Sequence, residues 1–416
     1  MRPLGVVVLI VLVDLLGFSL VMPLLAPFAK HYGFTAGQIG MLFAAYPMCQ
    51  LVAGPILGRL SDRYGRRPLL IFSQAGTALS FLILGLSRDF RVMLLARMLD
   101  GASGGNILVA QAYVADVTPP EHRARGMGLI GMAFGLGFVL GPLLGGLMLR
   151  LPVGEEWRLR LPFLVAAGFS TLAWVLVLTH LPESLPRDGA VRKEARVVNW
   201  RGIVDTVSLP RVGLLVLIGF LGVLGFATFE GTFALYLNGR LGWDESSASF
   251  AFAGLGFLTA LVQGGLIRRL VPRFGEARLI VSGLVLAAAG FAGLAMAANV
   301  PGLAGSMILL GLGQGLLSPS VSGLLSRITP ESEQGAVFGT LSSAQTLARM
   351  ISYETANVLL DRVSLGAPYW CAFGIDLLAL AVAGSLAVQL GRDTTKVPSS
   401  RAMGADLSAT AHDAPR

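Results

Sequence analysis

The chain has 416 residues, of which 54% are apolar and only 13% are charged. That charged share is about half the share in an average soluble domain, which excludes an ordinary soluble enzyme and predicts a membrane protein. The net charge of +8 does not indicate a nucleic-acid-binding protein, because the basic residues fall in short loops and form no stripe on one soluble domain.

Long apolar stretches recur along the whole chain. A helix that spans a bilayer needs about 20 apolar residues. The first stretch begins almost at Met1 and lacks a small-residue cleavage site, so we expect a retained helix and not a signal peptide. The predicted fold class is an all-α membrane protein with twelve transmembrane helices. They are expected at residues 4–28, 36–57, 68–87, 91–115, 126–149, 161–181, 212–237, 246–267, 278–297, 301–325, 335–360 and 366–390.

The basic residues are divided unequally between the two sides of these helices. If both termini lie on one side, that side holds 22 of the 32 lysines and arginines, and the other side holds 8. Basic loops remain in the cytoplasm, so the asymmetry predicts cytoplasmic termini in a multi-pass protein of a bacterial-type inner or plasma membrane. The remaining two, Arg97 and Arg349, fall inside predicted helices.

A polar stretch divides the chain six helices plus six. The predicted domains are an N-terminal half at 1–181, a cytoplasmic linker at 182–211, a C-terminal half at 212–390 and a disordered cytoplasmic tail at 391–416. An internal repeat supports the division, since Gly33 and Gly65 recur as Gly242 and Gly275. Duplicated halves are typical of secondary transporters, whose substrate site lies between the halves near the midplane.

Several kinds of chemistry are not expected. None of the lysines (Lys30, Lys193 and Lys396) follows a glycine, so the G-K-[ST] of a nucleotide-binding loop is missing. The two cysteines, Cys49 and Cys371, lie in apolar stretches, which argues against a disulfide framework or a thiolate metal cluster. We therefore predict no catalytic residue, no metal and no cofactor, and transport that is passive or driven by an ion gradient.

The segment between the second and third predicted helices is a loop rich in charge. Residues 58–67 contain four arginines and one aspartate. The segment resembles the loop motif G-x-L-x-D-R-x-G-R-[RK]-x-x-L of major facilitator superfamily transporters, and every fixed position is filled through Leu70. By this resemblance, the aspartate and an arginine meet an acid at the end of helix four and latch the two halves together. The alternative is a set of solvated charges that only determines topology. The predicted cytoplasmic gate comprises Gly58, Asp62, Arg63, Gly65, Arg66 and Asp116.

Three further motifs resemble the same superfamily. Helix four carries Arg97 and Asp100 in an R-x-x-Q-G…D pattern, with an aspartate where the family usually has glutamine. Helix one carries Leu16-Gly17-x5-Pro23, which is similar to twelve-helix drug:proton antiporters. Helix five matches the glycine–proline signature associated with antiporters, and the glycines at four-residue spacing form a smooth ridge for close helix contact. Its members are Gly128, Gly137, Gly141, Pro142, Gly145 and Gly146.

Together these motifs make residues 4–390 resemble a tetracycline-efflux-type drug:proton antiporter. The resemblance departs at the membrane-embedded acids. Tetracycline exporters carry aspartates in helices one, three and nine, and only Asp14 matches, because the other two positions fall on Ser80 and Ala287. We therefore expect an amphipathic solute other than a magnesium–tetracycline chelate, with cationic compounds among the candidates.

Charged residues at mid-membrane depth usually serve a function. Asp14 and Asp100 lie about ten residues into their helices, close to the midplane. The resemblance places helices one, four, seven and ten around the cavity, so these acids are candidates for the proton site, with Arg97 in coupling or anion contact. Two alternatives stay open: Asp14 as a buried acid that supports folding, and Asp100 with Arg97 as a structural ion pair.

The second half supplies fewer candidates. Glu230 and Gln314 are assigned to the cavity, with interfacial solvation and helix bridging as their respective alternatives. Arg349 and Glu354 share helix eleven and form a possible ion pair.

The predicted function is non-enzymatic: proton-coupled efflux of small amphipathic compounds by alternating access. The expected partners are a small-molecule substrate, protons and the lipid bilayer, without nucleic acid, and the protein is expected to act as a monomer. One alternative is a uniporter or proton symporter for a sugar or metabolite, since fold does not determine substrate or direction. A second alternative is a membrane sensor that transports nothing.

Overall fold

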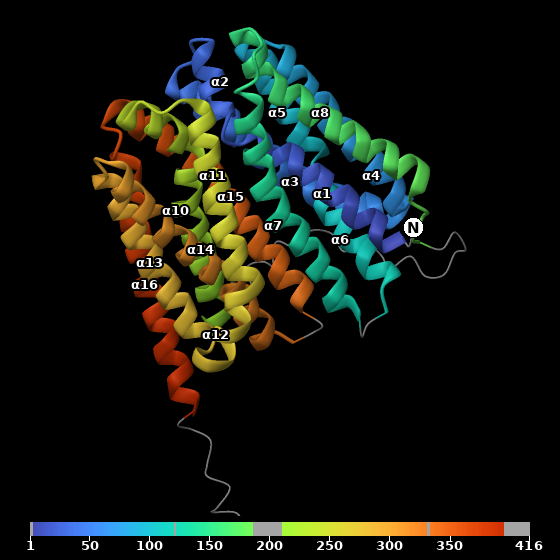
Figure 1. Ribbon diagram of the computed structural model, residues 1–416. Coiled ribbons are helices and arrows are strands. Elements are labelled where there is room, and N and C mark those ends of the chain that lie inside the picture. The colour runs from blue at the N-terminus through green and yellow to red at the C-terminus, as the bar shows by residue number, and fades with distance from the viewer. Residues whose placement is uncertain (1–2, 120–121, 186–209, 331–332, 395–416) are drawn as a thin grey trace, which may run out of the picture.

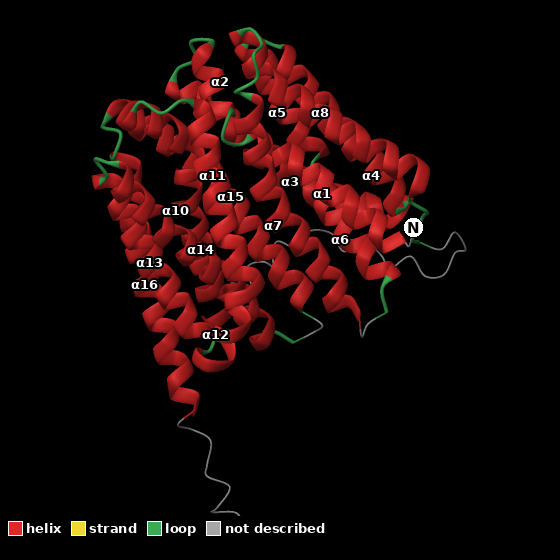
Figure 2. Ribbon diagram, in the orientation of Figure 1, coloured by secondary structure: helices red, strands yellow, loops and turns green. Residues whose placement is uncertain are grey.

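The structure is a computed structural model, and it describes residues 3–119, 122–185, 210–330 and 333–394. Within these ranges every regular element is a helix (Figure 2). The first group comprises α1 (Pro3–Val21), α2 (Leu25–His31), α3 (Ala36–Tyr64), α4 (Arg66–Leu86), α5 (Phe90–Ser103), α6 (Asn106–Val117), α7 (Arg123–Met148) and α8 (Glu155–His180). The second comprises α10 (Pro210–Leu241), α11 (Glu245–Leu261), a π-helical turn (Val262–Leu266), α12 (Ile267–Phe274), α13 (Glu276–Met296), α14 (Val300–Ile328), α15 (Gln334–Arg362) and α16 (Ala367–Thr394).

The described part of the chain contains 11 helical segments long and apolar enough to cross a membrane. The protein is therefore a multi-pass membrane protein, as predicted. The predicted helix eleven corresponds to α15, which has the length of a span, 29 residues, but is more polar than the others. It packs between α10 and α3, so much of its surface meets protein and not lipid.

The segments that the sequence assigns to the linker and the tail lie largely outside the described ranges. Most of the predicted linker, 182–211, is not described, and residues 391–394 of the predicted tail continue α16. The predicted domain boundaries therefore stay predictions. The helices nevertheless pack in two groups: α1 contacts α6, α7 and α8, while α10 contacts α14, α15 and α16.

The charged segment at 58–67 is not the loop that we predicted. Helix α3 continues to Tyr64, and Gly65 alone separates it from α4. No glycine or proline interrupts residues 59–64, so nothing ends the helix before Gly65. Gly65 has a φ of 108°, a backbone conformation that L side chains rarely adopt.

The repeated glycines mark equivalent turns in the two halves. Gly33 and Gly242 have φ values of 77° and 66°, and Gly65 and Gly275 have values of 108° and 76°. Only glycine takes such conformations without a steric cost. The sequence repeat therefore corresponds to a repeat in backbone geometry.

The two groups of helices are joined at the end opposite to the start of α1 and the end of α16 (Figure 1). They meet where α3 packs on α15 and where α7 packs on α11. Ser246 Oγ donates to Gly146 O at 2.9 Å, and Arg150 Nε donates to Ser246 Oγ at 3.0 Å. The Tyr353 ring lies 5.2 Å from the Phe43 ring. These hydrogen bonds and this ring contact hold the two groups together at this end.

Candidate functional site

A cavity of about 200 Å³ lies between the two groups, lined by residues of α1, α3–α7, α10 and α15. The charged residues of its lining are Asp14, Arg97, Asp100, Glu230 and Arg349. Four of the five residues predicted for the cavity are thus brought together. Gln314 of α14 is not part of this lining. Aromatic rings from both groups, among them Phe18 of α1 and Tyr353 of α15, complete the walls.

Asp14 is held by an amide and not by a cation. Helix α5 ends at Ser103 and α6 begins at Asn106, because two consecutive glycines interrupt the span between them. The Asn106 side-chain nitrogen donates to Asp14 Oδ1 at 3.1 Å and to Oδ2 at 3.0 Å. Within the described ranges Asp14 forms no ion pair, although only 7% of the residue is exposed. Asn106 was not identified from the sequence. A pair of glycines directly before a polar residue, inside an apolar span, could have indicated it.

Arg97 and Asp100 form a buried ion pair within α5. Arg97 Nη1 lies 3.0 Å from Asp100 Oδ2, and each side chain is 3% exposed. The same guanidinium donates from Nε to Leu42 O at 3.2 Å and lies 5.0 Å from the Tyr46 ring centroid. The geometry fits the structural ion pair that we considered as the alternative, since Arg97 already neutralises Asp100.

The second half contributes an ion pair that the sequence did not predict. Arg349 Nε lies 3.4 Å from Glu230 Oε2, and the Tyr353 hydroxyl donates to the same oxygen at 2.9 Å. The predicted pair between Arg349 and Glu354 is wrong. Five residues along a helix turn the side chain by about 140°, so the two point in different directions, and Glu354 lies against Gly40 of α3.

The glycine ridge of α7 lies against α1, the helix that carries Asp14. A side-chain carbon at Gly137 would lie 2.9 Å from Leu15 Cβ, and one at Gly141 would lie 2.8 Å from the backbone nitrogen of Leu20. Ser19 Oγ bridges the two helices by donating to Gly137 O at 2.7 Å. The close packing expected of this ridge is confirmed for these positions and for Gly145, which lies against Leu20 and Leu24.

The remaining members of the α7 signature differ among themselves. Gly146 lies against the Phe250 ring of α11, so it allows close packing between the two groups. Pro142 lies inside α7. A side-chain carbon added at Gly128 would meet no neighbouring atom within 4 Å, so packing does not require glycine there.

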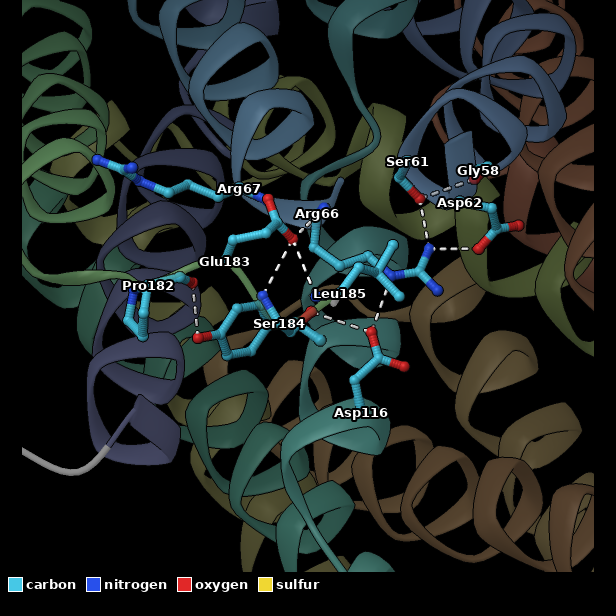
Figure 3. A network of polar contacts seen from close by, with 11 residues as sticks. Gly58, Ser61, Asp62, Arg66, Arg67, Asp116, Pro182, Glu183, Ser184 and Leu185 are labelled. Carbon is cyan, nitrogen blue, oxygen red and sulfur yellow. Dashed lines mark hydrogen bonds and ion pairs between the residues drawn. The ribbon is translucent and has the colours of Figure 1, made fainter. Parts of the chain in front are cut away.

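Four of the six predicted gate residues belong to one network of polar contacts near the junction of α3 and α4 (Figure 3): Gly58, Asp62, Arg66 and Asp116. Arg66 lies between two acids: its Nη1 is 2.5 Å from Asp62 Oδ1 and its Nε is 3.0 Å from Asp116 Oδ2. Arg66 Nη1 also donates to Ser61 Oγ at 2.6 Å, and Ser61 Oγ donates to Gly58 O at 2.7 Å. All of these residues belong to the first group. In this conformation the network does not join the two halves, and the latch stays a prediction.

Glu183, just after α8, is a member of this network that sequence reasoning missed. Its carboxylate accepts hydrogen bonds from the backbone nitrogens of Arg66 at 2.8 Å and Arg67 at 3.2 Å. A carboxylate at the first amides of a helix is stabilised by the helix dipole. Ser184 Oγ donates to Asp116 Oδ2 at 3.0 Å. The predicted gate residue Arg63, by contrast, lies 5.4 Å from the ring of its neighbour Tyr64.

At the two other positions where tetracycline exporters carry acids, this chain has no carboxylate that could bind a metal or a cation. Ser80 is fully buried and donates to Ala96 O at 2.8 Å. Ala287 is buried where α13 and α14 pack closely. Within the described residues, no three or more His, Cys, Asp or Glu side chains are grouped so that they could hold a metal ion.

A larger hollow of about 580 Å³ lies between α11 and α14. Its walls are almost entirely apolar, with Phe250, Leu258 and Ile308 among them, and contain no charged residue. The hollow therefore offers an apolar surface without charged groups, whereas the smaller central cavity is lined by Asp14, Arg97, Asp100, Glu230 and Arg349.

Two groups of membrane helices around a charged central cavity are the arrangement typical of secondary transporters. Comparison with known proteins agrees. The family model of the Major Facilitator Superfamily matches residues 7–353 and, in a second match, 269–409, and the chain belongs to that superfamily.

Its relatives include drug-resistance proteins. The chain is 30% identical over 350 residues to the class D tetracycline resistance protein of Salmonella ordonez, covering 83% of this chain and 86% of that one. It is 26% identical over 373 residues to the quinolone resistance protein NorA of Staphylococcus aureus, covering 88% and 92%. The resemblance predicted from the motifs is thereby confirmed.

Solved structures show the same fold. The human organic anion transporter MFSD10 matches with a TM-score of 0.68 and 26% identity, covering 92% of this chain and 99% of that one. An inward-facing, occupied bacterial homolog of the human lysosomal transporter Spinster matches with a TM-score of 0.73 and 15% identity, covering 92% and 96%.

Proposed function

We propose that the protein is a secondary active transporter that exports small amphipathic compounds in exchange for protons. The observation that carries the proposal is the state of Asp14. The other two acids of the cavity, Asp100 and Glu230, are each paired with an arginine, whereas among the described residues the Asp14 carboxylate accepts hydrogen bonds from the Asn106 amide and forms no ion pair. A carboxyl group in the membrane interior needs compensation for its charge, so Asp14 is suited to bind a proton and a cationic substrate group in turn. Binding of one in place of the other is the basis of antiport.

The energy available is sufficient for export. One proton that moves down a potential of about 100 mV supplies about 2.3 kcal/mol, and one pH unit adds about 1.4 kcal/mol. Their sum supports a substrate gradient of several hundredfold. The drug-resistance relatives support export of amphipathic drugs, while Ser80 and Ala287 argue against a metal–tetracycline chelate.

The proposal includes an orientation and a gate. We place both termini in the cytoplasm of a bacterial-type inner or plasma membrane, with the protein acting as a monomer. The contacts between α3 and α15 and between α7 and α11 then close the outer end. Asp62, Arg66 and Asp116 would form their cross-half latch when the cytoplasmic end closes, because a gate charge must exchange partners between two states.

The test uses inverted membrane vesicles with an acidic interior and an internal pH dye. A panel of amphipathic drugs is added to vesicles containing wild type, Asp14→Asn or, as a matched control, Glu354→Gln. We expect drug-triggered proton release in wild type and in the control, and none in Asp14→Asn. Absence of proton movement with every compound would favour the uniporter alternative, and drug-driven proton uptake would favour symport.

A further inference from the structure

The two arginines of the central cavity differ in accessibility. The Arg349 side chain is 38% exposed, whereas that of Arg97 is 3% exposed. Arg349 lies in the middle of the 29-residue helix α15 and lines the cavity. Its guanidinium is therefore presented to the cavity between the two halves, at a depth where an exposed cation usually has a ligand or a partner.

Glu230, the partner of Arg349, has its shorter contact with Tyr353. The Arg349–Glu230 contact is made through Nε at 3.4 Å, which is longer than the 2.7–2.9 Å that is typical of a charge-assisted hydrogen bond. The Tyr353 hydroxyl donates to the same Glu230 oxygen at the shorter distance of 2.9 Å. Glu230 thus keeps a hydrogen bond when Arg349 turns to another anion.

Arg97 cannot serve the same purpose. Asp100, the Leu42 carbonyl and the Tyr46 ring all engage its guanidinium, and the group is buried. Of the two cavity arginines, Arg349 is the one whose guanidinium is free to donate hydrogen bonds to a carboxylate of a ligand.

We propose that Arg349 is an anion-binding subsite for the transported compound, and that the preferred substrates are zwitterionic amphiphiles. Their cationic group meets Asp14 and their carboxylate meets Arg349. The inference rests on the proposed function, because it names the substrate class of the same cavity. Such a compound contacts α1 of the first half and α15 of the second, so its binding depends on how the halves are arranged.

A pair of probes that differ in one charge tests the subsite. Norfloxacin carries a basic amine and a carboxylate, and its methyl ester keeps the ring and the amine but lacks the negative charge. Binding is measured by fluorescence with the full-length protein in lipid nanodiscs. Wild type should bind the acid about tenfold or more tightly than the ester, the range of a hydrogen bond between charged groups. Arg349→Gln should abolish this preference without changing ester affinity.

Two further variants separate ligand binding from a structural role. Glu230→Gln frees Arg349 and should strengthen binding of the acid, whereas a merely structural pair predicts that either single variant weakens both ligands. Arg349→Gln/Glu230→Gln leaves no unpaired charge and should bind the ester as wild type does. Equal affinity of wild type for acid and ester, or equal loss of both in Arg349→Gln, overturns the subsite.

The outcome is distinguishable from failure of the proposed function. If the acid and the ester release protons from vesicles with equal potency, antiport stands and the Arg349 subsite is wrong. If the acid binds through Arg349 but moves no protons, the subsite stands and the antiport proposal is wrong.

Discussion

Each half of the molecule contributes one arginine–carboxylate pair to the cavity, and the two pairs are held differently. Arg97 and Asp100 are three residues apart on α5, 3.0 Å from each other and 3% exposed. Arg349 and Glu230 come from different helices, α15 and α10, are 3.4 Å apart, and leave Arg349 38% exposed. A pair on one helix moves as a unit, whereas a pair between helices is separated when the helices shift. We therefore expect the first pair to stabilise its half and the second to be available for exchange with a ligand.

The largest expected effect tests whether the first pair is structural. Arg97→Gln leaves the buried Asp100 carboxylate without its partner and should lower the free energy of unfolding by about 3–5 kcal/mol. Denaturant unfolding of the purified protein in detergent measures the change. The double variant Arg97→Gln/Asp100→Asn, which has no unpaired charge, should recover most of the loss. A single variant as stable as wild type would remove the distinction between the two pairs.

In the first half, the close packing of α7 against α1 should also contribute to stability. Gly141→Ala inserts a methyl group where α7 and α1 touch, 2.8 Å from the Leu20 nitrogen. Such overpacking should lower the free energy of unfolding by about 1–3 kcal/mol. Gly128→Ala is the matched control in the same helix, because nothing lies within 4 Å of the added carbon.

The control should behave in the opposite direction. Alanine favours a helix over glycine by about 0.5–1 kcal/mol, so Gly128→Ala should leave stability unchanged or raise it. The same unfolding measurement compares both variants with wild type. Equal destabilisation by the two substitutions would show that the motif requires glycine for a reason other than contact with α1.

The smallest expected effect concerns the second pair. Because Arg349 is partly exposed and its contact is long, the neutral double variant Arg349→Gln/Glu230→Gln should change the free energy of unfolding by no more than about 1 kcal/mol. Unfolding under the conditions used for Arg97→Gln gives the direct comparison. A loss as large as that of Arg97→Gln would mean that both pairs are structural and would leave the Arg349 subsite without its physical basis.

Sequence patterns that act over a few residues were sufficient for much of the site. Asp14 was found because a single acid stands out in an apolar span, and the ridge of Gly137 and Gly141 was found from its four-residue spacing. Asn106 and Glu183 were missed, because each acts on residues far away in the sequence. The partner of Arg349 was wrongly predicted for the same reason, since Glu354 was near in sequence but faces another direction.

The sequence by itself determined that this is a multi-pass helical membrane protein with a duplicated turn geometry and a charged α3–α4 junction. These features are local, because a bilayer requires each span to satisfy its own backbone hydrogen bonds with apolar side chains outside, and a left-handed turn requires glycine at its own position. Only the tertiary structure decided that Asp14 meets an amide, that Arg97 is sealed and that Arg349 faces the cavity beside Glu230. The partner of a buried charge depends on which helix faces are packed together, and that packing joins residues that no local pattern relates.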